Sequence, residues 1–268
     1  MLNNVSVQNK VNFTAGLRNS YYKEFSQISV NQIEKYFLSN YNVQTNFLNN
    51  KQLAIGNFLI LRIYEKLNKR YPTVFRVLTP NVYVFENNEL INPNATNAFC
   101  IPDIKRVLKK YPPFEMRSIF FRQNSYTIKD IDDISEVNYN NKSTCSAHFL
   151  SSFLHEWIHN THLDLLYRKY GYDGNSLLGK RLYNKKKDNV SYNKVKALFN
   201  TTFTDKEQEL IKNYVGEYAT LNPFEFFAET LTKFICDSLG NNLLPNESIF
   251  EKFNNYPDVF TRIFTKCL

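Results

Sequence analysis

The sequence predicts an α+β fold in which helices come first, strands follow, and two more helices lie in the second half. Up to Tyr71, apolar residues recur at helical spacing. From Val74 the chain turns to β-branched and aromatic runs bounded by Pro and Asn. Because helices and strands are segregated, the order indicates an α+β domain with an N-terminal helical part. We expect a helical region over residues 1–73 and a larger domain over residues 74–268, which could also form one continuous domain.

Two helices are expected in the N-terminal region. The stretch from Ser29 to Leu38 is amphipathic, and residues 53–71 carry apolar side chains at helical spacing. Pro72 should end the second of these helices, because proline cannot continue a helix.

The middle of the chain predicts strands, since short β-branched and aromatic runs alternate there with turn residues. The expected strands are residues 75–78, 82–85, 97–101, 118–122 and 134–139. Residues 102–111 are expected to form a short helix between them.

The second half opens with a helix that contains the run His155-Glu156-Trp157-Ile158-His159. Ser143 and Thr144 are its candidate N-caps. On a helix, the two motif histidines lie one turn apart and only about 40° apart around the axis, so both imidazoles can bind one zinc ion. Glu156 projects to the same side, where a carboxylate can take a proton from a water at the metal. The pattern indicates zinc-dependent peptide hydrolysis; the alternative is a buried helix that happens to carry two histidines.

The other two histidines of the chain, His148 and His162, lie in the same stretch. His148 is too far from His155 along a helix, by about 10 Å, to share an ion with it. We interpret it as structural or as facing the substrate. His162 is not at the position where the metzincin class has its third histidine, which here is Leu165, so we exclude that class.

A third metal ligand is expected on a second helix. Asn222 is a good N-cap, and Pro223 suits the first helical position. Glu225 and Glu229 then share one face. Glu225 can complete a His-His-Glu zinc site, and Glu229 can accept the free N–H of a ligating histidine. The alternative is a solvated acidic face, which the surrounding phenylalanines argue against.

These motifs resemble a known family. The motif of residues 155–159, the run Glu225-Phe226-Phe227-Ala228-Glu229 and Tyr218 before it are similar to the catalytic domain of anthrax lethal factor and its relatives, the Pro-Pro endopeptidases and Mlc titration factor A. Those proteins are gluzincin-type zinc metallopeptidases, and the resemblance covers roughly residues 115 to 240. It implies a zincin-like metalloprotease fold with Zn²⁺ as cofactor. The roles it implies are zinc ligands for His155, His159 and Glu225, general base for Glu156, oxyanion stabilisation for Tyr218, and support of a ligating histidine for Glu229.

Two further features would shape the cleft. In zincins the strand before the motif helix forms the upper edge of the cleft and pairs with an extended peptide, so the resemblance implies that role for residues 134–139. Gly171, Gly174 and Gly179 predict a flexible connection that could act as a lid, and Thr204 to Glu207 form a capping box that opens another helix.

The expected function is therefore that of a zinc-dependent endopeptidase acting on a protein or peptide substrate, and family analogy adds a toxin or effector role. Two alternatives belong to other classes. Peptide deformylase also uses this histidine motif, but the surroundings of Cys100 match its cysteine ligand poorly. The second alternative is a non-catalytic zinc-containing binding or effector protein on a zincin scaffold. Such a protein has no need of Glu156.

Composition excludes several classes of protein. With 43% hydrophobic and 16% aromatic residues, the chain is not disordered. A net charge of +8 without a base-reading motif does not predict nucleic-acid binding. The four cysteines form no C-x-x-C pair, so we expect reduced thiols rather than a cysteine zinc site or a disulfide scaffold.

The sequence also bears on location. The N-terminus has no basic region followed by an apolar core, so no signal peptide is expected. The most apolar run, residues 53–63, is too short to span a bilayer. We expect a soluble monomer without stable membrane insertion. It would be cytoplasmic, or secreted or translocated into a host by a signal-free route.

Overall fold

The structure is a computed structural model, and it describes residues 27–75, 79–86, 98–100, 118–123, 139–140, 145–146, 148, 150–170, 203–221 and 223–239. Its described elements are α2 (Val30–Tyr41), β1 (Thr45–Asn46), α3 (Lys51–Arg70), β2 (Asn81–Phe85), β3 (Ala98–Cys100), β4 (Ser118–Arg122), α6 (Ser151–Tyr170), α9 (Asp205–Tyr214), the 3₁₀ helix η3 (Tyr218–Thr220) and α10 (Pro223–Ser238). This composition confirms the α+β class. Over these same ranges, no helix combines the length and apolar character needed to cross a membrane.

The strands form one sheet in the order β1-β2-β4-β3, in which β3 alone runs antiparallel to its neighbour. The central strands β2 and β4 are buried along most of their length, as expected of parallel strands that are covered on both faces. Tyr83 and Phe120 are register partners, and their rings stack with centroids 5.5 Å apart. The strands predicted over 82–85, 97–101 and 118–122 are therefore confirmed within the described residues.

The two N-terminal helices are confirmed, and their ends follow from local chemistry. Ser29 and Gln32 form a capping box at the start of α2, while the Asn50 side chain accepts the N–H of Leu53 at the start of α3. The C-cap of α3 is Tyr71, directly before Pro72. The predicted capping box of Thr204 likewise opens α9.

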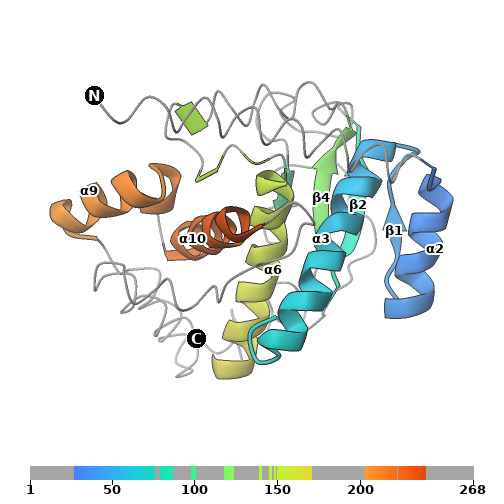
Figure 1. Cartoon of the computed structure of the whole chain (residues 1–268), viewed down its shortest axis with the longest axis horizontal. Coiled ribbons are helices and arrows are strands. Elements are labelled where there is room, and N and C mark those ends of the chain that lie inside the picture. Colours follow the sequence, from blue (N-terminus) through green and yellow to red (C-terminus); the bar gives the residue numbers. More distant parts are fainter. Residues whose placement is uncertain are drawn as a thin grey trace, which may run out of the picture.

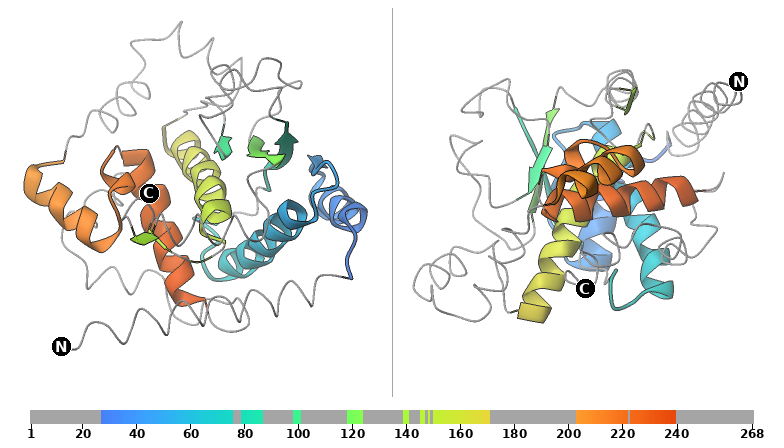
Figure 2. Two further views of the ribbon diagram at one scale, coloured as in Figure 1. Left: turned by 90° about the horizontal axis from the view of Figure 1, so that it is seen from above. Right: turned by 90° about the vertical axis from the view of Figure 1, so that its left-hand side faces the viewer.

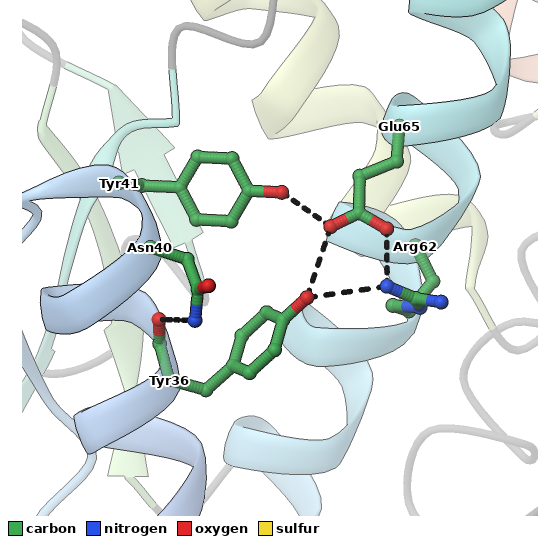
Figure 3. Close-up of polar contacts among 5 residues, drawn as sticks. All are labelled: Tyr36, Asn40, Tyr41, Arg62 and Glu65. Atoms are coloured by element: carbon green, nitrogen blue, oxygen red, sulfur yellow. Dashed lines mark hydrogen bonds and ion pairs between the residues drawn. The ribbon is translucent and has the colours of Figure 1, made fainter.

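A polar cluster joins α2 to α3 (Figure 3). The Glu65 carboxylate accepts hydrogen bonds from the hydroxyls of Tyr36, at 3.2 Å, and Tyr41, and it pairs with Arg62. Burial and the neighbouring Glu65 carboxylate raise the pKa of Tyr41 above its ordinary value, so its hydroxyl keeps its proton. Helix α2 is thus held to α3 by these hydrogen bonds, and it also buries Phe37 in the apolar core.

Helix α3 lies beside α6 on one face of the sheet (Figures 1 and 2) and holds it through buried polar groups. The Trp157 indole N–H donates to Asn57 Oδ1 at 2.9 Å, and the hydroxyls of Tyr64 and Thr161 lie 2.9 Å apart. Gly56 allows the close approach, because a Cβ there would lie 2.5 Å from Cζ of Phe153. Asn57, which interrupts the most apolar run of the sequence, is thus the partner of the only tryptophan.

The start of α6 was predicted wrongly. The helix begins at Ser151 and not after Ser143 or Thr144, so His148 precedes the helix. One reason is tertiary and the other is local: Glu229 accepts the backbone N–H of Cys145, and Nδ1 of His148 accepts that of Leu150, two residues later. These contacts occupy Cys145 and His148 outside the helix.

Two strand predictions need correction where the structure describes them. Phe75 lies in the turn that follows α3, where its N–H donates to Tyr71 O, and it is not in a strand. Tyr139 is helical, not extended. Residues 76–78, 102–111 and 134–138, the N-caps Ser143 and Thr144, the glycine-containing connection and the cap Asn222 lie outside the described residues.

Candidate metal centre

Three predicted ligand atoms converge where α6 meets α10. His155 Nε2 and His159 Nε2 are 2.9 Å apart, and each lies 3.2 Å from Glu225 Oε2. Zinc holds its ligands at about 2.0–2.1 Å in a tetrahedron, which separates neighbouring ligand atoms by roughly 3.3 Å. The observed triangle is close to that spacing, and its two nitrogens and one oxygen are the donor set that zinc accepts. Among the described residues, these three form the group able to hold a metal ion.

The packing of the two helices brings the ligands to one spot. On α6, Phe153, Leu154, Trp157 and Ile158 are fully buried, which turns the side of His155 and His159 away from the core. Helix α10 crosses beside α6 (Figures 1 and 2) and begins at Pro223, as predicted. Its first turn therefore brings Glu225 to the histidines. The side chains of the two histidines are 14% exposed and that of Glu225 is 18% exposed. The three side chains are therefore mostly buried but remain in contact with solvent.

Glu229 contacts the side of the candidate ligand His155 that faces away from His159 and Glu225. Its Oε1 lies 2.6 Å from His155 Nδ1, and its Oε2 accepts the backbone N–H of Cys145 at 2.8 Å. With Nδ1 facing this carboxylate, Nε2 of His155 faces the other ligands. Glu229 is itself 4% exposed, so this buried carboxylate is held from two directions.

The centre favours positive charge. Burial alone would lower the pKa of His155, but hydrogen bonds to Glu225 and Glu229 together raise it well above its ordinary value. Burial by itself would raise the pKa of Glu225, yet the neighbouring His159 and His155 hold it well below its usual range. The negative field that favours a proton here also favours a divalent cation.

Glu156 and Tyr218 flank the three ligands. Glu156 is 8% exposed on α6, and its charge is one of those that raise the pKa of His155. The Tyr218 ring, in η3, lies 5.9 Å from the His155 ring and is 43% exposed. Tyr214, at the end of α9, is 46% exposed. A buried carboxylate thus acts on His155 by its charge, and the ring of an exposed tyrosine lies near the same histidine.

The two remaining histidines lie outside the ligand group. His148 is buried before α6, and burial lowers its pKa to about 4. His162 is 1% exposed and stacks on Phe227 with ring centroids 4.1 Å apart, and burial lowers its pKa to about 3. Neither ring nitrogen of His162 has a hydrogen-bond partner among the described residues. His162 is thus a neutral aromatic core residue.

Sequence reasoning missed the segment that holds Glu229. The contact uses the backbone N–H of Cys145, which has no side-chain signal. Cys145 and Cys236 are buried free thiols, as expected for reduced cysteines. Cys100, on which the deformylase alternative depends, lies in β3, and its side chain is outside the described part of the chain.

Comparison with known proteins gives no relative. No protein-family model matches the chain, and neither does any curated protein or solved structure. The functional argument therefore rests on the residues of this chain.

Proposed function

We propose that this chain is a zinc-dependent endopeptidase that hydrolyses peptide bonds of a protein or peptide substrate. The observation that carries the proposal is the triangle of His155 Nε2, His159 Nε2 and Glu225 Oε2, with sides of 2.9, 3.2 and 3.2 Å. Glu156, the next residue after His155, adds a carboxylate whose charge acts on that histidine. Three protein ligands with one open position are typical of catalytic zinc sites, whereas structural sites have four protein ligands. A zincin-like arrangement of the fold is part of the same proposal.

Zinc held by the three side chains would supply a Lewis acid that polarises a peptide carbonyl and acidifies water. Glu156 is the base in this scheme. Its carboxylate takes a proton from the water whose oxygen bonds to the carbonyl carbon, and it then passes that proton to the leaving nitrogen as the C–N bond breaks. The products are a carboxyl group and an amine, so one water is consumed for each bond that is cleaved.

Two residues support this step. In this scheme the hydroxyl of Tyr218, whose ring centroid lies 5.9 Å from that of His155, donates a hydrogen bond to the oxygen that becomes negative in the transition state. Glu229 fixes the ring orientation of His155 through Nδ1 and raises the basicity of that ligand.

The position of Glu156 favours an enzyme over a metal-containing binding protein. This carboxylate directly follows His155 in α6, is 8% exposed, and its charge acts on His155. A binding protein gains nothing from such a group next to its metal ligands, whereas hydrolysis requires a base there.

The experiment is a survey of new protein N-termini after a cell lysate is incubated with the zinc-loaded protein. Glu156→Gln keeps the size of the side chain and removes the base. We expect wild-type protein to generate a defined set of new N-termini that the Glu156→Gln variant does not generate. Cleavage of the same sites at equal rates by both proteins would exclude this mechanism. If neither protein cleaves anything although both bind zinc, the binding-protein alternative is favoured.

A further inference from the structure

Exposed large apolar side chains are concentrated in the segment that carries Tyr218, whose ring lies beside the His155 ring. Five large hydrophobic residues are exposed in the described part of the chain, and three of them fall within residues 214–221. The five are Leu38, Tyr139, Tyr214, Tyr218 and Leu221. A single exposed apolar residue is ordinary, but a group beside reactive side chains marks a binding surface.

The backbone of residues 214–221 is fixed to the core at two positions. Val215 and Ala219 are buried at 6% and 0% exposure, so they fix the chain to the core. The N–H of Leu221 donates to Tyr218 O at 3.2 Å. Leu221 is nevertheless 61% exposed, the highest value among the exposed large hydrophobic residues that the structure describes. Its side chain is therefore presented to solvent by a fixed backbone.

Leu221 lies on the same side as Tyr218. A 3₁₀ helix has three residues per turn, so side chains at i and i+3 are eclipsed. Tyr218 begins η3, and Leu221 caps its end with helical dihedral angles. The centroid of the Tyr218 ring lies 5.9 Å from that of His155, and Leu221 follows Tyr218 by one turn of the 3₁₀ helix.

We infer that Leu221, together with the Tyr218 ring, binds an apolar side chain of the substrate next to the bond that is cleaved. This inference rests on the proposed function. The occupant is a substrate peptide and not a separate partner, because the Tyr218 ring lies beside His155, and the side chains of His155, His159 and Glu225 are themselves 14–18% exposed. Leu221 is thus a specificity-determining residue for peptides with leucine-like or phenylalanine-like side chains.

Binding of two zinc-directed probes tests the inference. The probes are dipeptide hydroxamates that differ in one side chain, isobutyl in one and hydroxymethyl in the other, and their Kd values are measured by calorimetry on the zinc-loaded protein. We expect wild type to bind the isobutyl probe about tenfold or more tightly, as is typical of one apolar side chain in a pocket. Leu221→Asn should lose that preference, whereas Leu221→Met should keep it.

Leu38→Asn is the matched control, because Leu38 is 53% exposed on α2 and lies outside the site. It should keep the preference of wild type. Equal binding of the two probes by wild type, or an unchanged preference in Leu221→Asn, overturns the inference and leaves the proposed function standing. Absence of zinc-dependent binding of either probe overturns the proposed function and this inference with it.

Discussion

Oε1 of Glu229 lies 2.6 Å from Nδ1 of His155, on the side of the ring opposite to Nε2 and the other two ligand atoms. The second oxygen of the same carboxylate holds the backbone of Cys145. One buried side chain therefore connects α10, the face of α6 that carries the candidate ligands, and Cys145 before α6.

The first prediction concerns this contact. Glu229→Gln removes the charge that orients His155, so zinc affinity should fall by roughly ten- to a hundredfold. Competition with a chromophoric chelator measures the zinc affinity. Asp237→Asn is the control, because Asp237 lies on the same helix and pairs with Lys233 at 3.1 Å. If Glu229→Gln binds zinc as tightly as this control does, Glu229 has no role in orienting the His155 side chain.

The second prediction concerns the hydroxyl of Tyr218. Tyr218→Phe should lower kcat by about a hundredfold with little change in KM, because the hydroxyl acts mainly on the transition state. The assay uses a peptide identified in the N-terminus survey. Tyr214→Phe is the matched control, since Tyr214 is 46% exposed and Tyr218 is 43% exposed. If kcat is unchanged in Tyr218→Phe and reduced in Tyr214→Phe, oxyanion stabilisation would be assigned to Tyr214.

The third prediction concerns the buried bond between α3 and α6. Asn57→Leu leaves the Trp157 indole N–H buried without its acceptor, which should cost about 1–3 kcal/mol of unfolding free energy. Replacing both partners, as Asn57→Leu with Trp157→Phe, removes the orphaned donor. The double variant should therefore lose less stability than the sum of the two single variants. Urea denaturation at pH 7 measures all four proteins, and strict additivity would show that the bond contributes nothing.

The fourth prediction concerns His162. Its pKa is lowered to about 3, whereas in the unfolded chain it titrates near 6.5. Between these values the unfolded state binds the proton and the folded state does not, so stability is lost as pH falls from 6.5 toward 3. His162→Phe keeps the stack on Phe227 and removes this loss. Both proteins are compared without zinc. Between pH 7 and pH 5, the unfolding free energy of the variant should fall by about 2 kcal/mol less than that of wild type.

Urea denaturation at the two pH values checks this difference. His155 and His148 titrate in both proteins, so comparing the variant with wild type isolates His162. Zinc content at pH 7 should be unchanged in His162→Phe, since His162 lies outside the ligand group. An equal loss of stability in both proteins, or a loss of zinc, would contradict the assignment of His162 as a neutral core residue.

Much of the helical structure was predictable because its signals are local. The cap residues Ser29 and Thr204 and the prolines Pro72 and Pro223 lie where the sequence predicts helix ends. The three candidate ligands were predictable for a related reason. A helix fixes the spacing of the two histidines, and the second acidic helix carries its own start signals.

Other features depend on contacts between distant residues, which periodicity does not reveal. One contact before the late start of α6 involves Glu229, which accepts the backbone N–H of Cys145 from 84 positions later in the chain. Asn57 interrupts an apolar run in the sequence, yet it is needed because Trp157, 100 positions later, brings an indole N–H into the core. Phe75 has the composition of a strand but completes the turn after α3.

The zinc content of the purified protein tests the central claim most directly. After reconstitution with zinc and dialysis, elemental analysis should find about one zinc per chain in wild type and in Glu209→Ala, which changes an exposed glutamate on α9. Glu225→Ala should hold less than about a tenth of an equivalent under the same conditions, because two histidines alone bind zinc weakly. A folded wild-type protein below that level, or a Glu225→Ala variant that holds as much zinc as wild type, would contradict the assignment of the metal centre.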